Sequence, residues 1–95
     1  MNKLTEEEIL SKLQKLSGWN YTGKSIQKEF KLENFISAVN FINKIAEVAE
    51  RIDHHPDINL HSYNKVTITL TTHSKGGVTE NDFKLAESIE PLFFK

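Results

Sequence analysis

Apolar and polar residues follow two different periods along the chain, and each change of period marks the border of an expected element. The first element is a helix, because Thr5 is a favourable N-cap, Glu8 completes a capping box, and the following apolar residues have helical spacing. These residues are Ile9, Leu10, Leu13 and Leu16. Gly18 is well placed to end the helix, because glycine readily adopts the left-handed conformation that closes many helices.

The period then changes to two, which is typical of a β-hairpin. Its strands lie between Trp19 and Leu32, and Lys28 is the one charged residue among the apolar positions of the second strand. Asn34 is expected to cap a long helix. The predicted apolar stripe of that helix contains Phe35, Ala38, Val39, Ile42, Ile45, Ala46 and Ala49.

A second hairpin is expected beyond a loop at residues 53–57. One strand lies near residues 58–60, and the other covers residues 66–71, where large aliphatic residues alternate with threonines. Thr79 then caps a last helix, which Pro91 is expected to interrupt. The apolar residues of this helix are Phe83, Ala86 and Ile89.

The predicted order is helix, two strands, helix, two strands, helix. Because each strand pair is followed by a helix, we expect an α+β fold of two layers, in which a four-stranded antiparallel sheet carries the helices on one face. The strand-strand-helix unit is repeated, and there is an extra N-terminal helix. A chain of 95 residues is long enough for one modest core, so we expect a single domain over residues 1–95.

The composition narrows the class of protein. Charged residues make up 26% of the chain but nearly cancel at a formal −1, so we expect neither direct nucleic-acid binding nor attraction to an anionic membrane. No stretch is apolar enough to span a bilayer, and the acidic start does not resemble a secretory leader. The absence of cysteine excludes disulfides and thiolate chemistry and favours a cytoplasmic location. A domain this small often gains stability by self-association.

Three of the four histidines are expected to meet at one place. Pro56 favours an extended conformation in the residue before it, which places His54 and His55 in a loop between helix and strand. His73 ends the second strand of the next hairpin, and antiparallel pairing would bring it back to this loop. Imidazole titrates near neutral pH, so histidines with carboxylates suit proton transfer in both directions. The nearby acids are Glu50, Asp53, Asp57 and Asp82.

Other interpretations of these residues stay open. Adjacent histidines in a loop are often only solvated, Asp82 sits where an acid favours a helix N-terminus, and Glu50 can be an ordinary surface residue. His61 has no expected partner and is predicted to lie on a strand surface. Three histidines and a carboxylate are also ligands for zinc, but the chain lacks His-x-His or His-x-x-x-His spacing, so we assign no metal site.

Three segments in a fixed order carry a more specific signal. They are Glu50-Arg-Ile-Asp-His-His-Pro-Asp, Tyr63-Asn-Lys-Val and Thr71-Thr-His-Ser-Lys-Gly-Gly-Val-Thr, with Asp82 beyond them. Together they resemble the signature of the pterin-4a-carbinolamine dehydratases, and the resemblance covers nearly the whole chain. The stretch from Pro56 to Tyr63 is one residue longer than the family form, which a β-bulge would absorb.

The resemblance implies an activity, the loss of water from a 4a-hydroxytetrahydropterin to give the quinonoid dihydropterin. It places the catalytic residues at His54, His55 and His73, and we expect His54 and His73 to transfer protons while His55 positions the substrate. The substrate-binding or orienting residues that it implies are Glu50, Asp53, Pro56, Thr71, Thr72, Ser74 and Asp82. Dehydration needs an acid and a base but no metal, nucleotide or redox cofactor, so no cofactor is expected.

The resemblance also implies a small-molecule pterin as binding partner and a homodimer or homotetramer, with dimers joined through their sheets. Phe93 and Phe94 are expected to be exposed and to contribute to a partner surface. Two rival functions stay open. One is a protein-interaction module, because animal members of this family bind a transcription factor, although the intact histidine motifs argue for catalysis. The other is a metal-dependent hydrolase, which a chelator would test.

Overall fold

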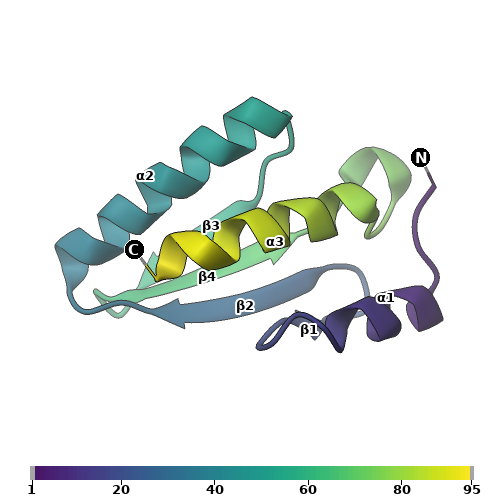
Figure 1. Cartoon of the computed structure of the whole chain (residues 1–95), viewed down its shortest axis with the longest axis horizontal. Coiled ribbons are helices and arrows are strands. Elements are labelled where there is room, and N and C mark those ends of the chain that lie inside the picture. Colours follow the sequence, from purple (N-terminus) through teal and green to yellow (C-terminus); the bar gives the residue numbers. More distant parts are fainter. Residues whose placement is uncertain (1, 95) are drawn as a thin grey trace.

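The computed structural model describes residues 2–94 and shows two layers, a sheet and a layer of helices on one of its faces (Figure 1). The four strands pair antiparallel in the order β1-β2-β4-β3. The predicted α+β fold, with helices on one face of a four-stranded antiparallel sheet, is therefore confirmed. In chain order the elements are α1 (Glu6–Leu13), β1 (Asn20–Tyr21), β2 (Ile26–Lys31), α2 (Phe35–Ile52), β3 (Asp57–His61), β4 (Lys65–Leu70), the 3-10 helix η1 (His73–Lys75) and α3 (Glu80–Phe93).

The core lies between the sheet and the helices. Alternate residues of β2 and β4 face inward, as the period of a strand requires, and they include the fully buried Ile26, Val66, Ile68 and Leu70. Removal of this apolar surface from water is the main term that stabilises such a fold. The helix residues that close the core are Ala38, Phe41, Ile45 and Ala49 of α2, and Phe83, Leu85, Ala86 and Ile89 of α3.

The helices begin at residues whose side chains accept hydrogen bonds from the first turn. In α1, the Glu8 backbone N–H donates to Thr5 Oγ1 at 3.2 Å and the Thr5 backbone N–H donates to Glu8 Oε1 at 2.8 Å, which is the predicted capping box. The hydrogen bond from the Thr5 backbone lowers the pKa of the Glu8 carboxyl below its ordinary value of 4.5. Asn34 caps α2 by accepting from the Ser37 N–H at 2.9 Å. Both predicted caps are confirmed.

The helix ends and faces differ in part from the predictions. α1 already ends at Leu13, and Gly18, with a φ of 88°, instead closes the turn that follows. Phe35 and Ala46 were predicted on the buried stripe of α2 but are exposed. The stripe that packs on the sheet includes Phe41, and Phe35 lies in the first turn at the margin of the core.

Pro91 does not interrupt α3, contrary to the prediction, because the helix continues to Phe93. A proline removes one backbone hydrogen bond and crowds the carbonyl four residues earlier, and only the last turn of α3 is affected. That turn is stabilised by Phe93, whose ring centroid lies 5.2 Å from that of Phe30 and 5.9 Å from that of Phe41. Phe93 is therefore partly buried rather than exposed as predicted, whereas Phe94 is 77% exposed.

The β3–β4 hairpin contains no bulge, so that prediction is wrong. All five residues of β3 pair in unbroken register with β4. The connection is a turn at residues 62–64, in which Ser62 and Tyr63 have positive φ angles of 51° and 58°. The unpaired residues of this hairpin are thus confined to its turn, at the other end of the strands from His54, His55 and His73.

Lys28, the charged residue predicted on an apolar strand face, lies at the edge of the core. Its Nζ is 2.7 Å from Glu90 Oε2 of α3 and donates to the Ser17 carbonyl at 3.0 Å. The Trp19 indole N–H donates to the same Glu90 oxygen at 2.8 Å. The exposed fractions of the Lys28 and Glu90 side chains are 18% and 22%. This cluster connects α3 to β2 and to the α1–β1 turn.

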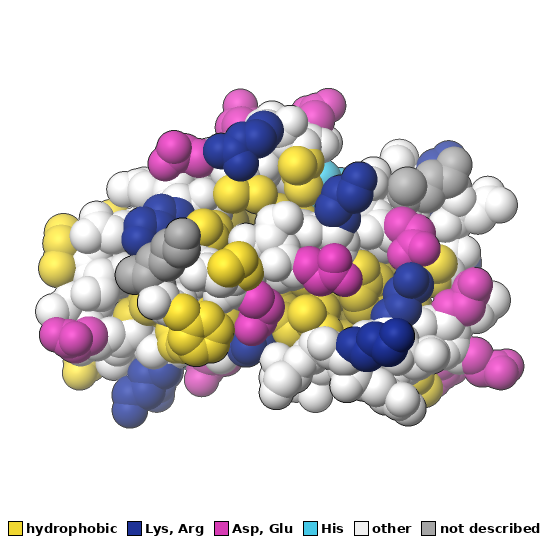
Figure 2. Space-filling model, viewed as in Figure 1, with side chains coloured by type: hydrophobic (Ala, Val, Ile, Leu, Met, Phe, Trp, Pro, Cys, Tyr) yellow, Lys and Arg dark blue, Asp and Glu magenta, His cyan; other side chains and the backbone are white. Residues whose placement is uncertain are grey.

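Acidic and basic side chains are interspersed on the helix face, and Figure 2 shows no large area of one sign there. Four of the exposed large apolar residues lie toward the end of the molecule where α2 begins, β3 turns into β4 and α3 ends (Figure 1). They are Phe35, Ile36, Tyr63 and Phe94. In the part of the chain that the structure describes, no helix has the length and apolar character needed to cross a membrane.

Candidate active site

The α2–β3 loop and the β4–α3 connection lie at the same end of the sheet, to the right in Figure 1. β3 begins at Asp57, which pairs with Thr69 near the end of β4. The antiparallel register therefore brings the segment with His54 and His55 next to the segment that leads to His73. This is the backbone arrangement expected from the hairpin.

His54 is held through both its backbone and its ring. Asp53 ends α2 in the left-handed conformation, with a φ of 55°, and the His54 backbone N–H donates to the Ala49 carbonyl at 3.1 Å. The ring atom Nε2 lies 2.5 Å from Asp82 Oδ1 in the first turn of α3. Only 13% of the His54 side chain is exposed, and the Asp82 side chain is fully buried. The end of α2 and the start of α3 thus fix the ring between them.

Asp82 receives hydrogen bonds on both carboxylate oxygens. Oδ1 faces the His54 ring, and Oδ2 accepts from the Thr79 backbone N–H and from the Thr72 hydroxyl, each at 2.8 Å. Asp82 is therefore the capping acid of α3 and also the partner of a histidine. The sequence left open whether Asp82 caps the helix or orients a histidine. The structure shows both contacts at once, because each uses a different carboxylate oxygen.

His55 has a different carboxylate partner. Its Nε2 lies 2.5 Å from Glu50 Oε2. The exposed fractions of the two side chains are 56% and 77%, so water screens this pair and its contribution to stability is small. Glu50 thus contacts His55 rather than His54.

His73 lies in a tight turn rather than at a strand end. β4 ends at Leu70, and His73 is the first residue of η1. A β-bridge between Thr72 and Gly77 closes this turn, and Gly76 supplies a left-handed residue with a φ of 72°. His73 is exposed. Among residues 2–94 no hydrogen bond or ion pair joins His73 to His54 or His55. The neighbouring residue Thr72 links this turn to the His54 partner Asp82 through its hydroxyl.

The remaining predicted site residues lie in the same two segments of the chain as the histidines. Asp53 and Ser74 are exposed, Pro56 is half-buried, and the Thr71 hydroxyl donates to the Lys24 carbonyl at 2.8 Å. Thr79 was identified from the sequence only as a helix cap. Its hydroxyl also lies 2.8 Å from that of Thr72, a contact that no spacing rule could have shown, because it depends on the closure of the turn.

His61 has partners that the sequence did not predict. Its Nε2 lies 3.1 Å from Glu29 Oε1 and 3.1 Å from Thr67 Oγ1, and the three residues come from neighbouring strands. They lie on the sheet face opposite the helices, away from the other histidines. Within residues 2–94, His, Cys, Asp and Glu side chains form no group of three or more that could hold a metal ion.

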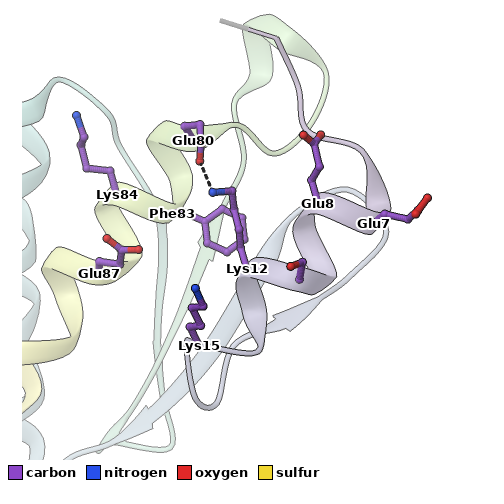
Figure 3. Close-up of a pocket in the computed structure, with 9 residues that line it drawn as sticks. Glu7, Glu8, Lys12, Lys15, Glu80, Phe83, Lys84 and Glu87 are labelled. Carbon is purple, nitrogen blue, oxygen red and sulfur yellow. Dashed lines mark ion pairs between the residues drawn. The ribbon is translucent and has the colours of Figure 1, made fainter.

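A cavity of about 790 Å³ lies elsewhere, between α1 and α3. Figure 3 shows Lys12 of α1 reaching toward Glu80 of α3, a 3.0 Å ion pair beside the Phe83 ring. We place the candidate site at the histidines instead, because this groove contains none. Its lining residues are Glu7, Glu8, Ser11, Lys12, Lys15, Glu80, Phe83, Lys84 and Glu87.

The fold and the histidine–carboxylate contacts define a class of small α+β domains with titratable side chains gathered at one end of an antiparallel sheet. The family model described as pterin 4 alpha carbinolamine dehydratase matches residues 2–92. This chain therefore belongs to the pterin-4a-carbinolamine dehydratase family.

Individual relatives agree with this assignment. A protein of Picosynechococcus sp. is 49% identical over 90 residues, covering 95% of this chain and 97% of the relative, and one of Sulfurisphaera tokodaii is 47% identical over 92 residues, covering 97% and 98%. Both carry the name "Putative pterin-4-alpha-carbinolamine dehydratase". The crystal structure of a transcriptional coactivator/pterin dehydratase from Brucella melitensis is similar, with a TM-score of 0.89, 41% identity, and coverage of 96% of this chain and 98% of that one.

A more distant structure shares the fold alone. It is a pterin dehydratase-like protein described as a RuBisCO assembly factor in the α-carboxysome, with 24% identity and a TM-score of 0.67. The match covers 80% of this chain and 89% of that one.

Proposed function

We propose that this chain is a hydro-lyase that removes water from a 4a-hydroxytetrahydropterin and gives the quinonoid dihydropterin. The observation that carries the proposal is the contact between His54 and Asp82. A nearly buried imidazole is held at 2.5 Å by a fully buried carboxylate, in a chain of the pterin carbinolamine dehydratase family. Such a pair fixes the orientation of the imidazole, the side chain that most often transfers protons in enzymes.

The reaction needs two proton transfers. The C4a–O bond breaks as the 4a-hydroxyl gains a proton from an acid and leaves as water. The N5 lone pair forms the C4a=N5 double bond, and the N5 proton passes to a base. The acid gives one proton and the base takes one, so the total number of protons on the two catalytic groups is unchanged. Each positioned acid or base contributes on the order of 10²–10⁴ in rate.

The histidines supply these groups. In this proposal His54 and His73 transfer the protons, and His55, paired with Glu50, positions the substrate. Asp82 orients His54. Asp53 and Ser74 are exposed and are available to hydrogen-bond the flat amide edge of the pterin ring.

We also propose that the chain acts in the cytoplasm as a homodimer or homotetramer. The support is the set of exposed apolar residues at the end opposite His54, His55 and His73, of which Ile36 is 61% and Phe94 is 77% exposed. Sedimentation velocity should show a species larger than the 10.9 kDa chain, and a monomer at every concentration would contradict this.

A protein-interaction module is the second candidate function. It is favoured by the same exposed apolar residues and by the similarity to the transcriptional coactivator/pterin dehydratase of Brucella melitensis. Such a module needs no chemistry at His54 or His73, so enzyme assays separate the two functions.

The test is the rate of 4a-hydroxytetrahydropterin dehydration, followed by ultraviolet absorbance, with and without EDTA. We expect the wild-type protein to accelerate the reaction equally in both conditions. His54→Ala and His73→Ala should each lower kcat/KM by about 10²-fold or more, because each removes one proton-transfer group.

His61→Ala is the matched control, because His61 lies on the opposite face of the sheet and should keep the wild-type rate. A folded wild-type protein without acceleration would refute the dehydratase and favour the interaction module. Loss of the acceleration in EDTA would contradict metal-free acid–base catalysis and would show that the protein needs a metal ion for its activity.

A further inference from the structure

Thr72, Thr79 and Asp82 form a chain of hydrogen bonds whose direction can be deduced. The Thr72 hydroxyl donates its single proton to Asp82 Oδ2 at 2.8 Å. The Thr72 oxygen also lies 2.8 Å from Thr79 Oγ1, so the Thr79 hydroxyl is the donor in that contact. Thr79 Oγ1 accepts in turn from the Asn81 backbone N–H at 3.3 Å. Every hydroxyl proton of the chain is therefore directed toward the carboxylate.

These contacts fix the orientation of the Asp82 carboxylate. Oδ2 accepts from two donors at 2.8 Å, the Thr72 hydroxyl and the Thr79 backbone N–H. Oδ1 is left to face Nε2 of His54 at 2.5 Å. Asp82 and Thr79 are fully buried, so water does not compete for these groups and the network is rigid.

The network determines which nitrogen of His54 carries a proton. A carboxylate only accepts hydrogen bonds, so Nε2 of His54 is protonated whether the ring is neutral or charged. In the neutral ring, the nitrogen without a proton is therefore Nδ1. Any proton that His54 gives or takes moves through Nδ1.

We propose that Thr72 and Thr79 are positioning residues, whose paired hydroxyls orient Asp82 so that it holds His54 as the Nε2–H tautomer and leaves Nδ1 to exchange protons with the substrate. The catalytic part of this inference rests on the proposed dehydratase function. The tautomer itself is a property of the free protein. If the hydroxyls only fastened the turn before η1 to α3, their loss would change stability but not the tautomer.

Nitrogen–proton correlation spectra of the histidine rings test this in the protein without substrate. Such spectra distinguish protonated from unprotonated ring nitrogens, and His54→Gln assigns one of the four ring systems to His54. We expect the proton on Nε2 in the wild type. Asp82→Asn should move it to Nδ1, because the amide NH₂ donates to Nε2 while the amide oxygen still accepts from Thr72 and Thr79.

The hydroxyl of Thr72 is tested in the same way. Thr72→Val should give a mixture of both His54 tautomers and lower kcat by about tenfold with little change in KM, an effect typical of outer-shell partners. Thr72→Ser keeps the hydroxyl and should restore the single Nε2–H tautomer and the wild-type kcat. Thr79→Val should also give a mixture of the two His54 tautomers. It replaces Thr72→Val in this test if Thr72→Val does not fold. Thr69→Val on β4, where Thr69 contacts Gln27, is the matched control and should leave the His54 signals unchanged.

Two results would overturn the inference, a wild-type His54 ring with its proton on Nδ1, or wild-type signals in both threonine-to-valine variants. Failure of the proposed function gives a different result. In that case the protein does not accelerate dehydration, yet the Nε2–H ring and its dependence on Thr72 remain.

Discussion

The positions of His54 and His55 follow from single residues. Pro56 predicts the loop correctly, because proline restricts the residue before it. The carboxylate partners could not be predicted in the same way. Glu50 precedes His54 by four positions, which favours contact on a helix, but Asp53 ends the helix in a left-handed conformation and turns the chain. His54 instead contacts Asp82, 28 residues further along.

Asp53 allows a prediction at this scale. A side chain in the left-handed region is strained by its Cβ, and glycine avoids that strain. Asp53→Gly should therefore be more stable than Asp53→Ala by about 1 kcal/mol in the free energy of unfolding, measured with urea. Both variants should lose activity if the carboxylate contacts the substrate. Equal stability of the two variants would show that the conformation of this residue is not maintained in solution.

At the scale of elements, patterning and capping rules predicted most helices and strands, because those rules depend on nearby residues. One failure occurred where a distant contact decides, because Pro91 remains helical while Phe93 packs on the aromatic core. Lys28 lies on the apolar strand face as predicted. Local sequence could not show that Glu90 and the Ser17 carbonyl are its partners there.

The Lys28–Glu90 pair gives a prediction for the packing of α3 on the sheet. Lys28→Met should lower the free energy of unfolding by about 1–3 kcal/mol, because it leaves a mostly buried carboxylate with one partner fewer. Adding Glu90→Gln removes that unpaired charge and keeps an acceptor for the Trp19 indole. The double variant should therefore lose less stability than the sum of the two single variants in urea unfolding. Additive losses would show that the pair does not couple.

At the scale of the whole molecule, the antiparallel sheet determines where the site lies. Its register brings the end of α2 and the start of α3 together at one end, and the exposed apolar side chains lie toward the other. The order of elements predicted this arrangement, since a repeated strand-strand-helix unit has few alternatives. It could not predict η1 or the Thr72–Thr79 contact, because both depend on the three-dimensional closure of one turn.

Across the whole molecule, the central proposal is that Asp82 acts in catalysis through His54. A double-mutant cycle on kcat/KM tests this most directly, with His54→Ala, Asp82→Asn and the double variant, each shown to be folded by circular dichroism. We expect His54→Ala to lose about 10²-fold or more, Asp82→Asn to lose less, and the double variant to be no worse than His54→Ala. Losses that multiply, or a His54→Ala protein with the wild-type rate, would contradict it.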